Sequence, residues 1–162
     1  MLHVLVMVPL AFIYSAILEW LIHKHILHGL GKNKESFWSF HWHSHHKTCR
    51  KNKNFDENYK FPGGPPVKKE VASLILLAAV HFPLWFVSKT FYLTLVFCAA
   101  RYFYLHRKCH TDIEWGKKKL PWHYDHHMGK EQDTNWGVTT ELVDLIMKTR
   151  MYYSTRVHKN EE

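Results

Sequence analysis

Two long apolar runs place the first constraint on the fold of this 162-residue chain. Residues 2–22, LHVLVMVPLAFIYSAILEWLI, are almost wholly apolar, and about 20 such residues are enough to cross a bilayer as a helix. A secretory signal peptide would begin with basic residues and end in a small-residue cleavage site, and neither is clear here. We therefore predict a retained membrane helix over residues 2–22, with a signal anchor as the alternative interpretation.

The second apolar run, residues 71–106, is too long for a single crossing. Its only polar break is SKT at 88–90, so a hairpin of two helices over 70–87 and 91–110 fits better. Each limb is slightly short and Pro83 is expected to kink the first, which leaves a half-buried hairpin as the alternative. The sequence thus predicts an all-α, integral membrane protein with about three membrane helices.

Basic residues lie almost entirely outside these apolar runs. Residues 24–69 hold ten Lys and Arg, residues 101–159 hold eleven, and the remaining one is Lys89 at the predicted hairpin tip. Three crossings would place both basic segments on one side, which the positive-inside rule makes cytoplasmic, with the N-terminus outside. The net charge of +8 then indicates contact with anionic lipid headgroups. No nucleic-acid-binding motif is found, and we expect no nucleic-acid partner.

The predicted organisation is one domain over residues 1–162, with a histidine-rich cap on the cytoplasmic side of the membrane. Its parts are a membrane helix (2–22), a histidine-rich segment (23–70), a membrane hairpin (71–106) and a histidine-rich C-terminal segment (107–162). An odd set of cysteines without C-x-x-C spacing is typical of reduced thiols: Cys49, Cys98 and Cys109.

Fifteen histidines far exceed background usage, and twelve of them fall into four groups. The groups are HKHILH at 23–28, HWHSHH at 41–46, HRKCH at 106–110 and HYDHH at 123–127. Neutral imidazole is a good ligand for Fe, Zn, Cu and Ni. One structural zinc takes about four ligands, so this surplus of histidines indicates two metals. Few carboxylates accompany the groups, which argues against Ca²⁺ and Mg²⁺.

Spacing explains how the histidines of the last two groups come together. Residues three and four apart share one face of an α-helix. This rule brings together the pair His106 and His110, and the trio His123, His126 and His127. The histidines outside the four groups have no such pattern. We predict that His3 and His81, in the apolar runs, are packed side chains and that His158 is solvated.

The first two groups are less regular. In the second, His41 and His45 are four residues apart and His46 is adjacent. In the first, His23 and His28 are five residues apart, which is about 140° around an ideal α-helix. Either the helix is distorted where it leaves the membrane, or these two histidines serve two metals.

Four such groups in this order, interleaved with apolar segments, resemble the fatty acid hydroxylase superfamily, the membrane di-iron group that includes sterol desaturases and carotenoid hydroxylases. HKHILHG resembles the first histidine box. WHYDHHMGKEQDTNWGVTTELVDLIMKT resembles the last box and the N-x-G-V-T segment after it. The resemblance spans roughly 19–149. In size and in HKHILHG the chain resembles compact bacterial carotenoid hydroxylases, whereas its third box is closer to the fatty acid hydroxylases proper.

The resemblance implies two irons per chain, with zinc able to replace iron. The second box departs from the commoner H-x2-H-H pattern because position 42 is Trp, so His43 is the rival of His41. The ligands implied by the resemblance are His23, His28, His41, His45, His46, His106, His110, His123, His126 and His127.

The same resemblance implies O₂ activation and oxygen insertion into an unactivated C–H bond of a lipid, or desaturation. Such a bond offers no group for acid–base chemistry, so the metal must carry the reaction. The chain lacks a dinucleotide fingerprint, a flavin or haem motif and a cysteine set for an iron–sulfur cluster. We therefore expect an external electron carrier: a ferredoxin, a cytochrome b5-like carrier or their reductase.

Several alternatives remain open on the sequence alone. Fatty acyl, sterol and carotenoid substrates are not separated, and a carotenoid hydroxylase of the β-carotene type is the runner-up within the family. A histidine-rich membrane protein that binds or transports metal is the rival of a different class. The lysine run at 117–119 fits a dock for an acidic electron carrier, or is simply solvated.

Three carboxylates are candidates for orienting metal-bound imidazoles. Glu19 lies four residues before His23 at the end of the predicted membrane helix, where an ionisable residue is a functional candidate. Asp112 and Asp125 adjoin the third and fourth histidine groups. The alternative for each is a solvated or salt-bridged carboxylate.

Overall fold

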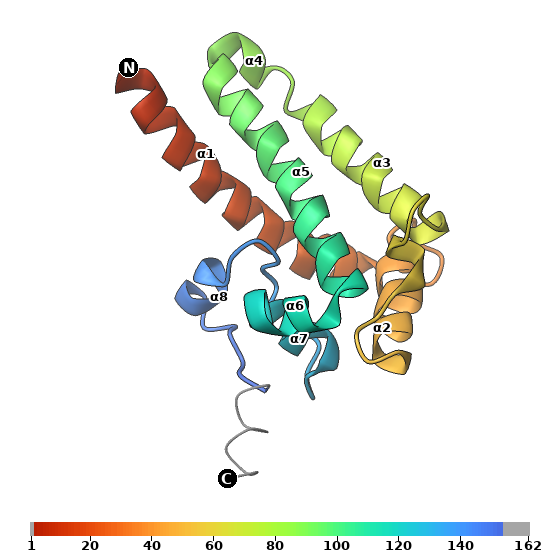
Figure 1. Cartoon of the computed structure of the whole chain (residues 1–162). Helices are drawn as coiled ribbons and strands as arrows, with labels where there is room; N and C mark the ends of the chain where they lie inside the picture. Colours follow the sequence, from red (N-terminus) through yellow and green to blue (C-terminus); the bar gives the residue numbers. More distant parts are fainter. Residues whose placement is uncertain (1, 154–162) are drawn as a thin grey trace.

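The computed structural model describes residues 2–153, and this part of the chain is helical with no strand, which confirms the all-α prediction (Figure 1). Three long helices form one half of the molecule: α1 (Leu2–Leu21), α3 (Pro65–Val80) and α5 (Lys89–Thr111). Helix α5 packs against both of the others. His158 lies outside the described residues.

Helix α1 continues without a break into the π-helix η1 (Ile22–Leu30). Together they form a segment of 29 residues, and only 11% of its most apolar 18-residue stretch is buried within the protein. Large side chains such as Leu2, Leu5 and Ile13 point outward. Judged by length and composition, this is the one described helix that is long and apolar enough to cross a bilayer.

The predicted hairpin is present with different limits. Helix α3 has 16 residues and α5 has 23, and a turn and the short helix α4 (Leu84–Val87) join them. Pro83 does not kink the first limb, because α3 ends at Val80 and Pro83 instead precedes α4. A proline lacks the amide proton that a helix interior needs, and it disfavours helix at the residue before it.

The two long helices of the hairpin, α3 and α5, differ in length. At 1.5 Å per residue α3 is about 24 Å long, less than the ~30 Å of a hydrocarbon core. Its outer face nevertheless exposes Ile75, Leu76 and Val80, and a contiguous apolar surface of that kind marks contact with lipid or with another protein. The number of crossings and the orientation therefore stay predictions.

The N-terminus and the hairpin tip lie at the same end of the molecule (Figure 1). His3 Nε2 is 3.4 Å from Ser88 Oγ, which caps α5 by accepting a hydrogen bond from the Phe91 amide at 3.2 Å. His3 is exposed, so the prediction that it is packed was wrong. His81 is half-buried and hydrogen-bonded to Tyr14 Oη at 2.9 Å.

The histidine-rich segments gather at the other end, where short helices form a cap (Figure 1). Helix α6 (Ile113–Lys119) follows α5 directly because Asp112 caps it, accepting a hydrogen bond from the Trp115 amide at 3.2 Å. The cap is built from η2 (Phe40–His46), α2 (Lys47–Lys51), η3 (Glu57–Tyr59), α6 (Ile113–Lys119), α7 (Pro121–Met128) and α8 (Leu142–Ile146).

Cysteine labelling tests the orientation. Ser88 is buried and caps α5, whereas Val87 at the tip is 80% exposed and Lys34 is exposed beside the cap. We expect a membrane-impermeant maleimide to label Val87→Cys only from outside and Lys34→Cys only from the cytoplasm. The wild-type chain, whose three cysteines are buried, is the blank. Labelling of both variants from the cytoplasmic side would contradict the three-crossing topology.

Candidate metal centre

The first two histidine groups lie in π-helical segments. η1 spans Ile22–Leu30 and η2 spans Phe40–His46. A π-helix bonds each residue to the one five positions on, so residues five apart stand about one turn apart on the same side. The ring centroids of His23 and His28 are accordingly 5.1 Å apart, and those of His41 and His46 are 4.8 Å apart. The irregular spacing of the first group therefore reflects a distorted helix.

Five buried histidines form the first cluster, each offering a ring nitrogen within 4.8 Å of all the others: His23, His28, His41, His46 and His126. Nε2 of His46 lies 3.0 Å from Nε2 of His28, 3.2 Å from that of His41 and 3.1 Å from that of His126. One ring nitrogen cannot form three hydrogen bonds at once. Two nitrogens bound to one metal at right angles, each about 2.1 Å from it, stand about 3.0 Å apart. The first cluster therefore fits a metal ion.

Four further buried histidines form the second cluster: His45, His106, His110 and His127. Within residues 2–153, Nε2 of His45, Nε2 of His106 and both ring nitrogens of His127 are buried without a hydrogen-bond partner. A buried polar atom left unsatisfied costs about 1–3 kcal/mol. Three rings of one cluster therefore have a nitrogen available for a ligand, and imidazole nitrogen is a good donor for a transition metal.

His123 lies between the two clusters. Its Nε2 is 3.1 Å from Nε2 of His110. Its ring centroid is 4.7 Å from that of His127 in the second cluster and 5.8 Å from that of His126 in the first. The structure therefore brings all ten histidines implied by the resemblance into one buried core, divided into two groups.

The two other histidines of these boxes lie outside the core. His25 is exposed on η1. His43 is half-buried, and its Nε2 is 2.9 Å from the carbonyl oxygen of Lys32. The second box thus contributes His41, rather than its rival His43, to the first cluster.

Carboxylates on the outside of the core orient three of the rings. The pairs are His45 Nδ1 with Asp56 at 2.8 Å, His106 Nδ1 with Glu70 at 2.7 Å and His28 Nδ1 with Asp133 at 3.0 Å. An Nδ1–H that donates to a carboxylate leaves Nε2 with its lone pair facing the cluster, and it makes that nitrogen a better ligand. Tyr59 Oη donates to the other oxygen of Glu70 at 2.5 Å, which holds that carboxylate in place.

Backbone carbonyl oxygens orient three more rings in the same way. The contacts join His23 Nδ1 to Trp136 O at 2.6 Å, His110 Nδ1 to Asn54 O at 2.9 Å and His126 Nδ1 to Thr134 O at 2.6 Å. Gln132 takes this position for His46, with its amide nitrogen 2.9 Å from Nδ1. Seven of the ten histidines therefore have a polar partner on the side away from the core.

Glu19 supports the core indirectly, through the loop that follows the last histidine box. Its carboxylate accepts hydrogen bonds from the amides of Val138 and Thr139 and from the Thr139 hydroxyl at 2.7 Å. These bonds tie α1 to the N-x-G-V-T loop, whose Trp136 carbonyl accepts from His23. The carboxylate thus positions the loop rather than a ring directly.

Of the two other candidate carboxylates, Asp125 is buried and forms an ion pair with Arg150 at 3.0 Å. Asp112 is exposed, caps α6 and pairs with Lys108 at 3.0 Å. The structure therefore gives Asp112 a role in starting α6 rather than in orienting a ligand.

Sequence reasoning missed Asp56, Glu70 and Asp133 as partners of the histidines. The argument that selected Glu19 could also have found Glu70, because Glu70 is an ionisable residue at the edge of an apolar run. Asp133 follows the last box closely, but Asp56 lies in a loop with no motif of its own.

Six of the core histidines have a lowered pKa and are neutral at physiological pH. Burial, reinforced by neighbouring histidines, holds the pKa well below its usual value for His41, His45, His46, His123, His126 and His127. The neutral ring is the form that binds metal. The hydrogen bond from His28 lowers the pKa of Asp133 to about 2, so this carboxylate stays charged.

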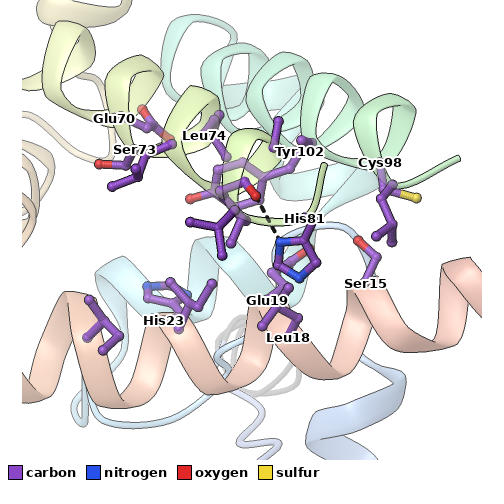
Figure 2. Close-up of a pocket in the computed structure, with 18 of the residues that line it drawn as sticks. Ser15, Leu18, Glu19, His23, Glu70, Ser73, Leu74, His81, Cys98 and Tyr102 are labelled. Atoms are coloured by element: carbon purple, nitrogen blue, oxygen red, sulfur yellow. Dashed lines mark hydrogen bonds between the residues drawn. The ribbon is translucent and has the colours of Figure 1, made fainter. Parts of the chain in front are cut away.

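An apolar cavity of about 310 Å³ adjoins the first cluster. Figure 2 shows it between α1 and α3, with His23 toward one end and Ser15 and Cys98 toward the other. His41 also lines it, and most of the remaining wall is Leu, Ile, Val and Ala from α1, η1, α3 and α5. An apolar molecule in this cavity would therefore lie directly against the histidine core.

Comparison with known proteins gives one match. The model of the family described as Fatty acid hydroxylase matches residues 8–149, a span that includes all ten histidines of the core. No curated protein and no solved structure matches the chain.

Metal analysis tests the centre. We expect about two metals per purified chain, because two histidine clusters exceed the needs of one ion. His127→Ala should lower this content, whereas His25→Ala, which alters an exposed ring of the first box, should not. A content near zero in the wild type, unchanged in His127→Ala, would contradict the prediction. Zinc in an overexpressed sample would count as a replacement for iron.

A second experiment tests the outer carboxylates. Asp56→Asn weakens the hold on His45 Nδ1 without changing the side chain's shape, so metal affinity should fall by about 10–100-fold. Asp112→Asn is the matched control, because that carboxylate is exposed and should leave the affinity unchanged. Chelator competition measures both variants. Equal affinities in the two would show that Asp56 does not support the centre.

Proposed function

The chain belongs to the fatty acid hydroxylase family, and we propose that it is a membrane di-iron oxygenase that hydroxylates or desaturates a lipid C–H bond. Family membership by itself suggests a lipid hydroxylase or desaturase. The observation that carries the finer proposal is the pair of buried histidine clusters beside an apolar cavity. Two metal positions next to an apolar binding space suit the oxidation of a hydrocarbon by metal-activated O₂.

The chain's own residues would divide the work as follows. Bound iron would supply O₂ activation, which no side chain offers. Ring nitrogens of the two clusters would hold the metals, while Asp56 and Glu70 keep the rings of His45 and His106 in one orientation. The apolar walls exclude water and hold the substrate carbon against His23 and His41.

Iron suits this donor set. Imidazole binds Fe, Zn, Cu and Ni alike, so ligand type alone does not select the metal. The proposed reaction needs a metal that changes oxidation state, and zinc does not. Zinc bound at the same histidines would therefore produce an inactive protein.

Two observations favour this proposal over a metal-collecting or transport protein. The core histidines are at most 2% exposed and most have fixed outer partners. A flexible loop that collects metal would leave its rings in solvent. The clusters also lie at one end of the long helices, whereas transporters bind their cargo near the bilayer midplane.

The proposal places the metal centre on the cytoplasmic side of the membrane, where soluble electron carriers are found. Both histidine-rich segments lie at the same end of the long helices (Figure 1). That end also carries most of the basic residues, which is the arrangement of the positive-inside rule.

Reducing equivalents would come from a separate acidic carrier that docks on α6. This helix lies between α5, which carries His110, and α7, which carries His123. Its last turn exposes three lysines, of which Lys117 pairs with Glu114 at 2.9 Å. The remaining two, Lys118 and Lys119, present positive charge close to the core, and complementary charge speeds encounter with a carrier.

Reconstitution tests the proposal. Protein in lipid with O₂ and NAD(P)H alone should be inactive, because the chain has no motif for a dinucleotide, flavin or iron–sulfur cluster. Adding a ferredoxin or cytochrome b5 system should produce an oxidised lipid, detected by mass spectrometry, and His127→Ala should abolish the product. Metal uptake without any lipid product under these conditions would favour the metal-binding alternative.

Charge reversal separates the docking surface from the chemistry. The double variant Lys118→Glu and Lys119→Glu should slow turnover with the protein carrier, and high salt should slow the wild type likewise. Turnover with a small chemical reductant should be unchanged. Lys89→Glu, at the opposite end of the molecule, is the control. Turnover that is insensitive to salt and to the double variant would exclude this dock but not the external donor.

A further inference from the structure

We propose that α8 lies in the membrane interface, with the outer side of residues 142–147 buried among lipids beside the last turns of α1. The sequence places this segment in the cytoplasmic cap, so α8 would be a second point of contact with the bilayer. The proposal goes beyond the proposed function, and its test involves no turnover.

The polarity of α8 is the reverse of that of a helix facing water. Its buried residues are Val143 and Asp144. Its outer face consists of the large apolar side chains Leu142, Leu145 and Ile146, the last of which is 69% exposed. Positions three and four apart share one side of a helix, so these three side chains stand together. A gathered apolar surface of this kind marks contact with lipid or with another protein.

The contacts of α8 place it beside α1, within the apolar run (Figure 1). Val143 packs against Trp20, and Ala16 adjoins the same cluster. Trp20 Nε1 also donates to Asp144 at 3.2 Å. Ala16 and Trp20 lie about 9 Å and about 3 Å of helix rise before Ile22, the end of the predicted membrane helix. A helix in the membrane interface buries its apolar face by about 5–10 Å, so α8 lies at the matching depth.

The outer face of α8 continues the lipid-facing surface of α1. On α1 the side chains of Ile13, Ile17 and Leu21 are exposed. Their spacing of four residues makes them one stripe, which runs next to the stripe of Ala16 and Trp20 that α8 covers. Lipid around an α1 that crosses the bilayer would therefore also meet the exposed side of α8.

Basic side chains border this apolar surface at the level of the headgroups. Lys24 Nζ lies 4.4 Å from the ring centroid of Trp20, and Lys148, just after α8, is exposed. Tryptophan and lysine in these positions are typical of a membrane interface, where anionic headgroups attract the positive charge. Lipid suits this surface better than a second copy of the chain, because both copies would carry a net charge of +8.

Contact of α8 with lipid would also hold the loop that orients His23. The Asp144 carboxylate accepts hydrogen bonds from the amides of Trp136 at 2.9 Å and Gly137 at 2.7 Å. The Trp136 carbonyl oxygen in turn lies 2.6 Å from His23 Nδ1. The depth of α8 therefore fixes the height of this loop relative to the bilayer.

Fluorescence quenching tests the contact in the full chain, reconstituted at low density in vesicles of phosphatidylcholine and phosphatidylglycerol. An NBD label on Ile146→Cys should be quenched by lipids with a nitroxide on the acyl chain as strongly as a label on Ile13→Cys of α1. Aqueous iodide should quench it about fivefold less than a label on Lys34→Cys, which is exposed in the cap. The wild-type chain, whose three cysteines are buried, is the blank.

Two further labels separate insertion from a local disturbance at Ile146. Leu142→Cys should behave like Ile146→Cys, whereas Lys148→Cys, at the edge, should be quenched by both reagents. Iodide access at Leu142 and Ile146 equal to that at Lys34 would overturn the proposal. Shielding from both quenchers would overturn it too, because protein, such as a second copy, would then cover α8. Iodide access at Ile13 would remove its premise, that α1 lies in the bilayer.

Discussion

The structure depends on the burial of ten imidazole rings in one core. Every one of these side chains is at most 2% exposed, and a buried polar group is costly unless it is satisfied. Seven of the ten rings have an outward nitrogen that meets a polar partner, such as the carboxylates of Asp56 and Glu70 or the carbonyl of Trp136. The inward nitrogens converge on one another at about 3 Å or have no protein partner, which is the arrangement that a bound metal satisfies.

That core joins the long helices to the cap. His23 extends from the helix that begins at Leu2, and His110 lies one residue from the end of α5, so movement of either helix would displace ligands. The loop that receives His23 is itself held by Glu19 and by Asp144, whose carboxylate accepts from the Trp136 amide at 2.9 Å and the Gly137 amide at 2.7 Å. Metal binding and the packing of the long helices are therefore linked through these contacts.

The position of the core also explains the proposed division of the molecule. The apolar cavity approaches the first cluster from among the long helices, whereas α6 approaches the core from the cap. A lipid would reach the metals from one direction and a water-soluble carrier from the other. In the proposed arrangement the cavity would set which lipid binds, and the lysines of α6 would affect only the supply of electrons.

The sequence by itself determined the all-α fold, the apolar first helix, the four histidine boxes and the family, because hydrophobic runs and motif spacing are local properties. Only the tertiary structure decided how the boxes combine. The π-helical turn that aligns His23 with His28 cannot be read from an α-helical period. The packing of the cap brings His41 rather than His43 into the first cluster. The carboxylate partners also come from distant positions: His106 and Glu70 are 36 residues apart, and His28 and Asp133 are 105 apart. Contacts at that separation are set by the packing of helices, and no local pattern encodes them.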